Sequence, residues 1–68
     1  MSNVFKKVEI VGTSSTSFAD AVKAAVAEAS KTIRHISWFE VIEQRGSVRD
    51  GNVYEFQVTI NVGFKLER

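Results

Sequence analysis

A single tryptophan is the side chain in this sequence best suited to bind a flat ligand. Trp38 lies in the stretch RHISWFEVIEQRG, residues 34–46, where apolar and polar residues alternate almost one by one. Such alternation is typical of a strand, whose successive side chains face opposite sides. An exposed indole can stack on a planar ligand, and it can equally pack against another subunit. The pattern alone leaves both interpretations open.

Residue types of common catalytic sites are present, but not in catalytic arrangements. His35, the only histidine, begins the same strand and has no evident serine, cysteine or carboxylate partners. Glu40 and Glu43 fall on opposite faces by alternation, so they do not form a carboxylate pair. Residues 12–17, GTSSTS, could bind an anion, but they lack a phosphate-loop pattern and a capped helix start explains them. We therefore predict no catalytic residues and expect that the protein is not an enzyme.

The composition excludes several other kinds of site and partner. There is no cysteine, so disulfides and thiolate metal sites are excluded, and we predict no metal site, although carboxylate sites for hard cations stay possible. The net charge of +1 gives no field that would attract nucleic acid. No apolar run approaches the roughly 20 residues that span a bilayer, and no signal peptide is evident. We expect a soluble cytoplasmic protein without a membrane partner.

The length of the chain favours self-association. The 68 residues allow one domain, which we place at 1–68. A domain of this size buries only about 60% of its unfolded surface, so its core is marginal without support. Without disulfides or a structural metal, oligomerisation is the favoured support.

The first half of the chain predicts a strand and a helix. Residues 4–11 alternate as a strand. Residues 18–32 repeat apolar side chains at helical spacing, and Ser17 with Asp20 forms a capping arrangement at the helix start.

The second half predicts a hairpin. A strand over 35–47 is followed by Asp50-Gly51, the dipeptide of a tight turn, and then by a strand that alternates over 54–66. The order β-α-β-β predicts an α+β fold, a three-stranded antiparallel sheet packed on one helix. The neighbour of the first strand in that sheet stays open.

The hairpin predicts which residues face each other. With two turn residues, the numbers of facing residues add up to 101, which sets Phe39 against Val62 and Val41 against Ile60. We expect these four side chains to close the core beneath the helix.

The same register puts Trp38 opposite Gly63 on the other face, in company with Ile36, Ile42, Thr59 and Asn61. Gly63 would leave room beside the indole. Gln57 shares this face opposite Gln44, about 20 Å along the strand from Trp38. Any site that uses both Trp38 and Gln57 is therefore built between subunits, unless a bulge shifts the register. Arg45 falls on the helix side, opposite Phe56.

Several segments resemble the dodecins, small flavin-binding proteins of bacteria and archaea. The matching segments are KKVEIVGTSSTS, ASKTIRHISWFEV, EQRG and YEFQVTINVGF, which cover nearly the whole chain in the order and spacing of that family. The resemblance implies a β-α-β-β fold that assembles into hollow spheres of twelve subunits. In these assemblies flavins are stored in pairs at subunit interfaces, between tryptophans.

The resemblance also assigns the ligand-binding residues. It implies that Trp38 stacks on the flavin, that Gln57 bonds the isoalloxazine edge, and that Arg45 lies near ligand phosphate or coenzyme A. Ser37 stands near the ligand where bacterial relatives usually have an acidic residue, which weakens any charge-assisted contact there. The implied function is storage and buffering of FMN, with riboflavin or another flavin possible, and quenching of its photochemistry.

Two alternatives accompany this function. The chain could be a structural assembly module whose flavin pocket is empty or degenerate. Coenzyme A could also bind at basic surface residues such as Arg45 and Lys65, alone or beside a flavin.

Overall fold

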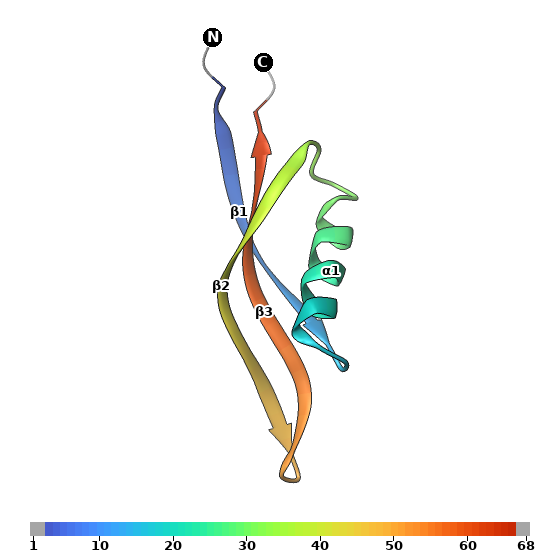
Figure 1. Cartoon of the computed structure of the whole chain (residues 1–68). Coiled ribbons are helices and arrows are strands. Elements are labelled where there is room, and N and C mark those ends of the chain that lie inside the picture. The colour runs from blue at the N-terminus through green and yellow to red at the C-terminus, as the bar shows by residue number, and fades with distance from the viewer. Residues whose placement is uncertain (1–2, 67–68) are drawn as a thin grey trace.

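The computed structural model describes residues 3–66, which fold into three strands and one helix in the predicted order β-α-β-β. The elements are β1 (Phe5–Ser14), α1 (Phe18–Ala29), β2 (Ile36–Arg49) and β3 (Asn52–Lys65). The sheet order is β1-β3-β2 and both pairings are antiparallel, so the neighbour of β1 is β3 (Figure 1). The predicted fold class is therefore confirmed. The ends of the predicted domain, residues 1–2 and 67–68, lie outside the described residues.

The helix begins where its cap was predicted and ends earlier than predicted. Ser17 has an extended backbone, and its hydroxyl oxygen accepts a bond from the Asp20 N–H at 3.0 Å. At the other end, the N–H groups of Lys31 and Thr32 donate to carbonyls three residues back, those of Glu28 and Ala29. This tighter turn ends the helix at Ala29, three residues before the predicted end.

A small core lies between α1 and the middle of the sheet. Two buried helix alanines, Ala21 and Ala25, form one cluster with the fully buried Val58, Ile60 and Val62 of β3. Gly12 lets the helix approach β1 closely, because a Cβ there would meet the Ala21 carbonyl and lie 2.7 Å from the Ala25 Cβ. The predicted first strand ended at residue 11, but β1 continues through Gly12 to Ser14 because β3 supplies pairing partners that far.

The helix covers β1 and β3 rather than β2. A helix about 10 Å across spans two strands that lie about 4.8 Å apart, and in this fold those two are β1 and β3. Phe39 and Val41 on β2 therefore stay 49% and 45% exposed. The prediction that they close the core is wrong, although their partners Val62 and Ile60 are the predicted ones.

The long hairpin of β2 and β3 carries three irregularities that shift its register. The turn is the predicted one, with positive φ angles of 53° at Asp50 and 78° at Gly51, the geometry of a type I′ turn. Bulges leave three residues without a facing partner: Tyr54 on β3, and Ile42 and Ser37 on β2. The Tyr54 and Ile42 bulges cancel, so the pairing of Trp38 with Gly63 is the predicted one.

The residues between or beyond these bulges are placed differently from the prediction. Arg45 lies opposite Gln57 instead of Phe56, and Gln44 opposite Val58 instead of Gln57. Arg45 therefore shares a face with Gln57, and its predicted position on the helix side is wrong. Ile36 lies opposite Phe64 and packs against the core, so its predicted position beside Trp38 is also wrong.

Candidate functional site

Trp38 lies on the sheet face opposite α1, and its indole packs against the backbone of Gly63, the residue that faces it on β3. We call this the outer face, and on β3 it comprises Glu55, Gln57, Thr59, Asn61, Gly63 and Lys65. A Cβ at Gly63 would lie 2.7 Å from the indole Cδ2 and closer still to Cε2 and Cζ2, so only glycine fits beneath the ring. The Phe5 ring of β1 lies beside the indole, with centroids 5.1 Å apart and planes tilted by 56°. The indole thus has a defined seat and remains 39% exposed.

Next to the indole, a three-residue polar cluster crosses all three strands of the outer face. Lys7 lies opposite Gly63, and its Nζ is 2.6 Å from the Glu40 Oε1. Asn61, opposite Glu40, donates its Nδ2–H to the same oxygen at 3.1 Å. The hydrogen bond from Lys7, followed by that from Asn61, lowers the pKa of the Glu40 carboxyl. The register expected from the turn sets Glu40 against Asn61, since 40 and 61 add up to 101, whereas the role of Lys7 needed the pairing of β1 with β3.

A second polar network lies further along β3. Arg45 donates its Nε–H to the Gln57 Oε1 at 2.9 Å, and Gln57 donates its Nε2–H to the Glu55 Oε1, also at 2.9 Å. The bulge at Tyr54 creates this network, because it brings Arg45 opposite Gln57, and the bulge at Ile42 ends the shifted segment. Sequence reasoning missed Glu55, which shares the Gln57 face by simple alternation.

The structure brings Arg45 and Gln57 together but leaves Trp38 apart from them. Gln57 lies six residues along β3 from Gly63, the seat of Trp38, which corresponds to about 20 Å. Ser37 is the bulge residue next to Trp38, and its hydroxyl donates to the His35 carbonyl at 3.2 Å. Of the four predicted site residues, one chain therefore presents two separate groups, Trp38 with Ser37 and Gln57 with Arg45.

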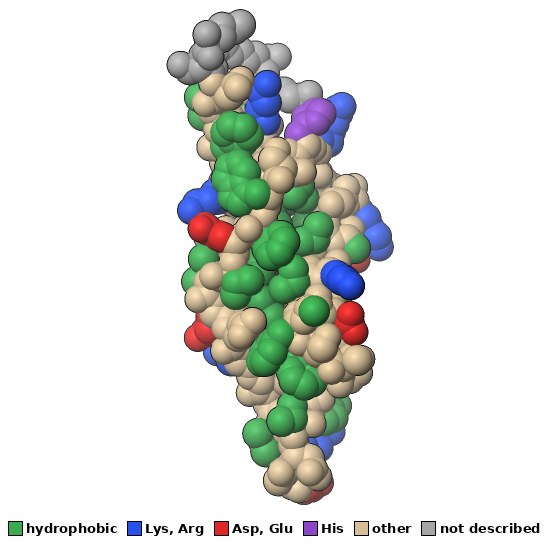
Figure 2. All heavy atoms as spheres, viewed as in Figure 1, with side chains coloured by type: hydrophobic (Ala, Val, Ile, Leu, Met, Phe, Trp, Pro, Cys, Tyr) green, Lys and Arg blue, Asp and Glu red, His purple; other side chains and the backbone are tan. Residues whose placement is uncertain are grey.

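Apolar side chains cover much of the remaining surface. The molecule extends 54 Å along its long axis and 13 Å along its shortest, too thin to enclose most of them. Figure 1 shows the hairpin of β2 and β3 extending well beyond the helix, and Figure 2 shows hydrophobic side chains along the whole length of the visible face. The large exposed hydrophobic residues are Val4, Phe5, Val11, Trp38, Phe39, Val41, Ile42, Val48, Val53, Tyr54 and Leu66. A surface of this kind marks an interaction site.

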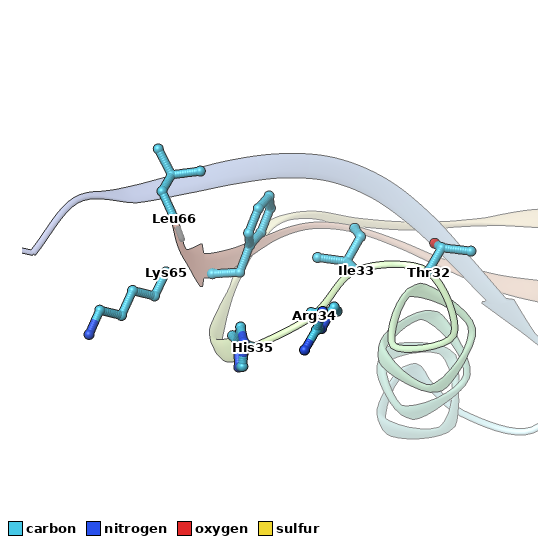
Figure 3. A pocket seen from close by; sticks show the side chains of 7 residues that line it. Thr32, Ile33, Arg34, His35, Lys65 and Leu66 are labelled. Atoms are coloured by element: carbon cyan, nitrogen blue, oxygen red, sulfur yellow. The ribbon is translucent and has the colours of Figure 1, made fainter. Parts of the chain in front are cut away.

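A shallow pocket lies where the chain passes from α1 into β2. It has a volume of about 320 Å³ and is lined by Thr32, Ile33, Arg34, His35, Phe64, Lys65 and Leu66. In Figure 3, Lys65 and His35 point to one side of the end of β3 while Leu66 points to the other. Arg45 does not belong to this pocket. It lies opposite Gln57, which is eight residues along β3 from Lys65, so Arg45 and Lys65 are about 26 Å apart.

Residues 3–66 lack two other kinds of feature. They contain no group of three or more histidine, cysteine, aspartate or glutamate side chains that could hold a metal ion. No helix in this part of the chain is long and apolar enough to cross a membrane.

The sheet bears a half-exposed tryptophan on the face away from the helix, which is typical of a small binding protein. Comparison with known proteins identifies its family. The sequence model of the Dodecin family matches residues 4–67. A Thermus thermophilus protein named dodecin is 52% identical over 67 residues, which are 98% of this chain and 97% of that protein. The chain belongs to the dodecin family.

Solved structures agree with this assignment. A Thermus thermophilus protein of known crystal structure is 51% identical and superposes with a TM-score of 0.94, covering 98% of both chains. The calcium dodecin of Mycobacterium tuberculosis is 33% identical over 94% of this chain and 90% of its own length. Its crystal structure, described as having a novel calcium-binding site, gives a TM-score of 0.82 over 94% of this chain and 91% of that one. None of these relatives is named as an enzyme.

Proposed function

We propose that this dodecin sequesters flavin, FMN or riboflavin, in stacked pairs between Trp38 side chains of neighbouring subunits, and thereby suppresses flavin photochemistry. The observation that carries the proposal is the seat of Trp38. Gly63 supports one part of the indole and Phe5 its side, while 39% of the residue stays accessible to a second flat ring. An indole in contact with a flavin is also an electron donor, which quenches the excited flavin.

The separation of Trp38 and Gln57 supports a site between subunits. One flavin cannot reach both residues of one chain, because they lie about 20 Å apart along β3. A site with both therefore takes Trp38 from one subunit and Gln57, with Arg45, from another. The large exposed apolar surface supports the same view, since it needs partners to cover it. We propose that this assembly is a homododecamer in which residues 1–68 form each single-domain subunit.

Arg45 and Ser37 have subordinate parts in this proposal. The Arg45 Nε–H is used by Gln57, which leaves the two terminal NH₂ groups of the guanidinium free to bond the FMN phosphate. The Ser37 hydroxyl is bonded to the His35 carbonyl, so we assign it a place beside the ligand without a charged contact.

Fluorescence titration tests the proposal. We expect FMN emission to be quenched on addition of the protein, which should elute from gel filtration far above the size of a monomer. Trp38→Ala should abolish most of the binding and quenching, whereas Tyr54→Ala, which removes another exposed aromatic residue at the far end of the hairpin, should preserve both. Unquenched FMN with assembled wild-type protein would favour the alternative, a structural assembly module with an empty pocket.

Coenzyme A is a second candidate ligand because Arg34 and Lys65 line one pocket. A polyphosphate group would suit these two cations. Calorimetric titration of coenzyme A into wild type and Lys65→Ala tests it, and equal affinity of the two proteins would contradict it.

A further inference from the structure

The Gln57 side chain is held by two neighbours that agree on one orientation of its amide. Its oxygen accepts from the Arg45 guanidinium, and its nitrogen donates to the Glu55 carboxylate, both at 2.9 Å. A guanidinium can only donate and a carboxylate can only accept. Turning the amide over would place its NH₂ group against Arg45 and its oxygen against Glu55, so both contacts would become unfavourable.

This arrangement leaves a defined hydrogen-bonding edge on the amide. A primary amide has two acceptor sites on oxygen and two N–H donors. Arg45 and Glu55 use one of each, so one acceptor site remains on the oxygen and one N–H on the nitrogen, the two atoms bonded to the amide carbon. The complementary group on a ligand is a ring N–H next to a ring carbonyl, as in a cyclic imide.

The irregularities of the hairpin set the register of this network.

 The bulge at Tyr54 moves the pairing by one residue, the bulge at Ile42 moves it back, and Arg45 faces Gln57 only in the segment between them. Glu55 reaches Gln57 from two residues along the same strand and face. The three side chains of the network therefore come from one short segment of the pairing between β2 and β3.

We infer that Glu55 and Arg45 are positioning residues that fix the Gln57 amide in one orientation and make the site select planar rings with a cyclic imide edge. The inference rests on the proposed flavin-binding function and deepens it, because it assigns a role to Glu55 and states which part of the ligand is recognised. Without these two neighbours, a glutamine amide turns freely between two orientations, of which one matches the imide edge.

A pair of ligands measures this role directly. Riboflavin carries the imide N–H, and 3-methylriboflavin replaces that N–H with a methyl group. The ratio of their dissociation constants reports recognition of the imide edge, whereas a general loss of stability or assembly weakens both ligands together. We expect wild type to prefer riboflavin, and Gln57→Ala to lose most of that preference.

Glu55→Ala is the decisive variant. Without Glu55 the Gln57 side chain is free and must be ordered again on binding, so the dissociation constant of riboflavin should rise roughly threefold to tenfold. The dissociation constant of 3-methylriboflavin should change little, so the preference for riboflavin falls. Glu55→Gln keeps an acceptor oxygen and should recover part of the ratio. Glu28→Ala, which removes an equal charge from the exposed surface of α1, is the matched control and should keep the wild-type ratio.

The outcomes separate this inference from the proposed function. If wild type binds riboflavin and Glu55→Ala keeps the wild-type ratio, the positioning role is wrong while flavin binding stands. If assembled wild type binds neither ligand, the proposed function fails and the inference fails with it. Should Glu55→Ala not assemble, Gln57→Ala decides, since a ratio equal to that of wild type would show that the Gln57 amide does not recognise the imide edge and would overturn the role.

Discussion

Replacing Gly63 with alanine should displace the Trp38 indole and weaken flavin binding. The new methyl group would lie 2.7 Å from the indole Cδ2 and closer to two other ring atoms, whereas ordinary contacts of a Cβ begin at 3.4 Å. The Cδ2 atom alone must move by 3.4 − 2.7 = 0.7 Å, and the two closer ring atoms must move further. Because the other side of the methyl group is the backbone of β3, the ring can only move outward or swing aside.

The size of the effect follows from that displacement. A gap of 0.5–1 Å forfeits about a quarter to a half of the dispersion attraction at a contact. Stacking of one flat ring on an aromatic side chain is worth about 1–3 kcal/mol. The variant should therefore lose about 0.3–1.5 kcal/mol. This loss corresponds to a roughly 1.5-fold to tenfold higher Kd for FMN.

Two measurements check this expectation. FMN fluorescence quenching gives the Kd, and tryptophan emission of the ligand-free protein should shift to longer wavelength as the indole leaves its seat against Gly63 and Phe5. Thr59→Ala, a change on the outer face of the same strand away from the indole, is the control and should alter neither signal. Wild-type affinity together with unchanged tryptophan emission in Gly63→Ala would refute the seat as described.

Two further predictions concern stability. Gly12→Ala should lower the free energy of unfolding by about 1–3 kcal/mol, because the new methyl group would push α1 away from β1 at the Ala21 carbonyl and the Ala25 Cβ. Thermal unfolding measures this loss, and an unchanged midpoint would contradict the prediction. Because the hydrogen bond from Lys7 lowers the pKa of Glu40 below its ordinary 4.5, this carboxylate stabilises the fold fully above pH 4.5 and its contribution is lost as the pH falls through the lowered value. Lys7→Met should therefore flatten the decline of stability in acid, as followed by denaturant unfolding at a series of pH values, and an identical acid profile would show that the pair contributes nothing.

Strand β2 exposes large apolar side chains on both of its faces. Phe39 and Val41 stay exposed on one face of β2, and Trp38 stays exposed on the other. Exposed apolar surface of this kind marks an interaction site, and under the proposed function ligand binding and assembly use the same strand. Variants of Trp38 should for this reason always be compared at equal oligomeric state.

Local features of the sequence determined the elements themselves. The cap at Ser17, the alternation of β3 and the Asp50-Gly51 turn each act over a few neighbouring residues, so their pattern is complete within the sequence. The pairing of Trp38 with Gly63 followed from the turn as well, since the two intervening bulges cancel.

The tertiary structure decided how these elements meet. A bulge leaves no reliable mark in the apolar-polar pattern, so the neighbours of Arg45 became clear only when both strands were in place. The seat of Trp38 needs Phe5 from the distant end of the chain, and the exposure of Phe39 depends on which two strands the helix covers. The sequence by itself determined the strands, the helix and the face of the tryptophan, because these depend on short-range periodicity. Tertiary packing alone joined Glu55, Gln57 and Arg45 into one network, because that contact depends on a register summed over the whole hairpin.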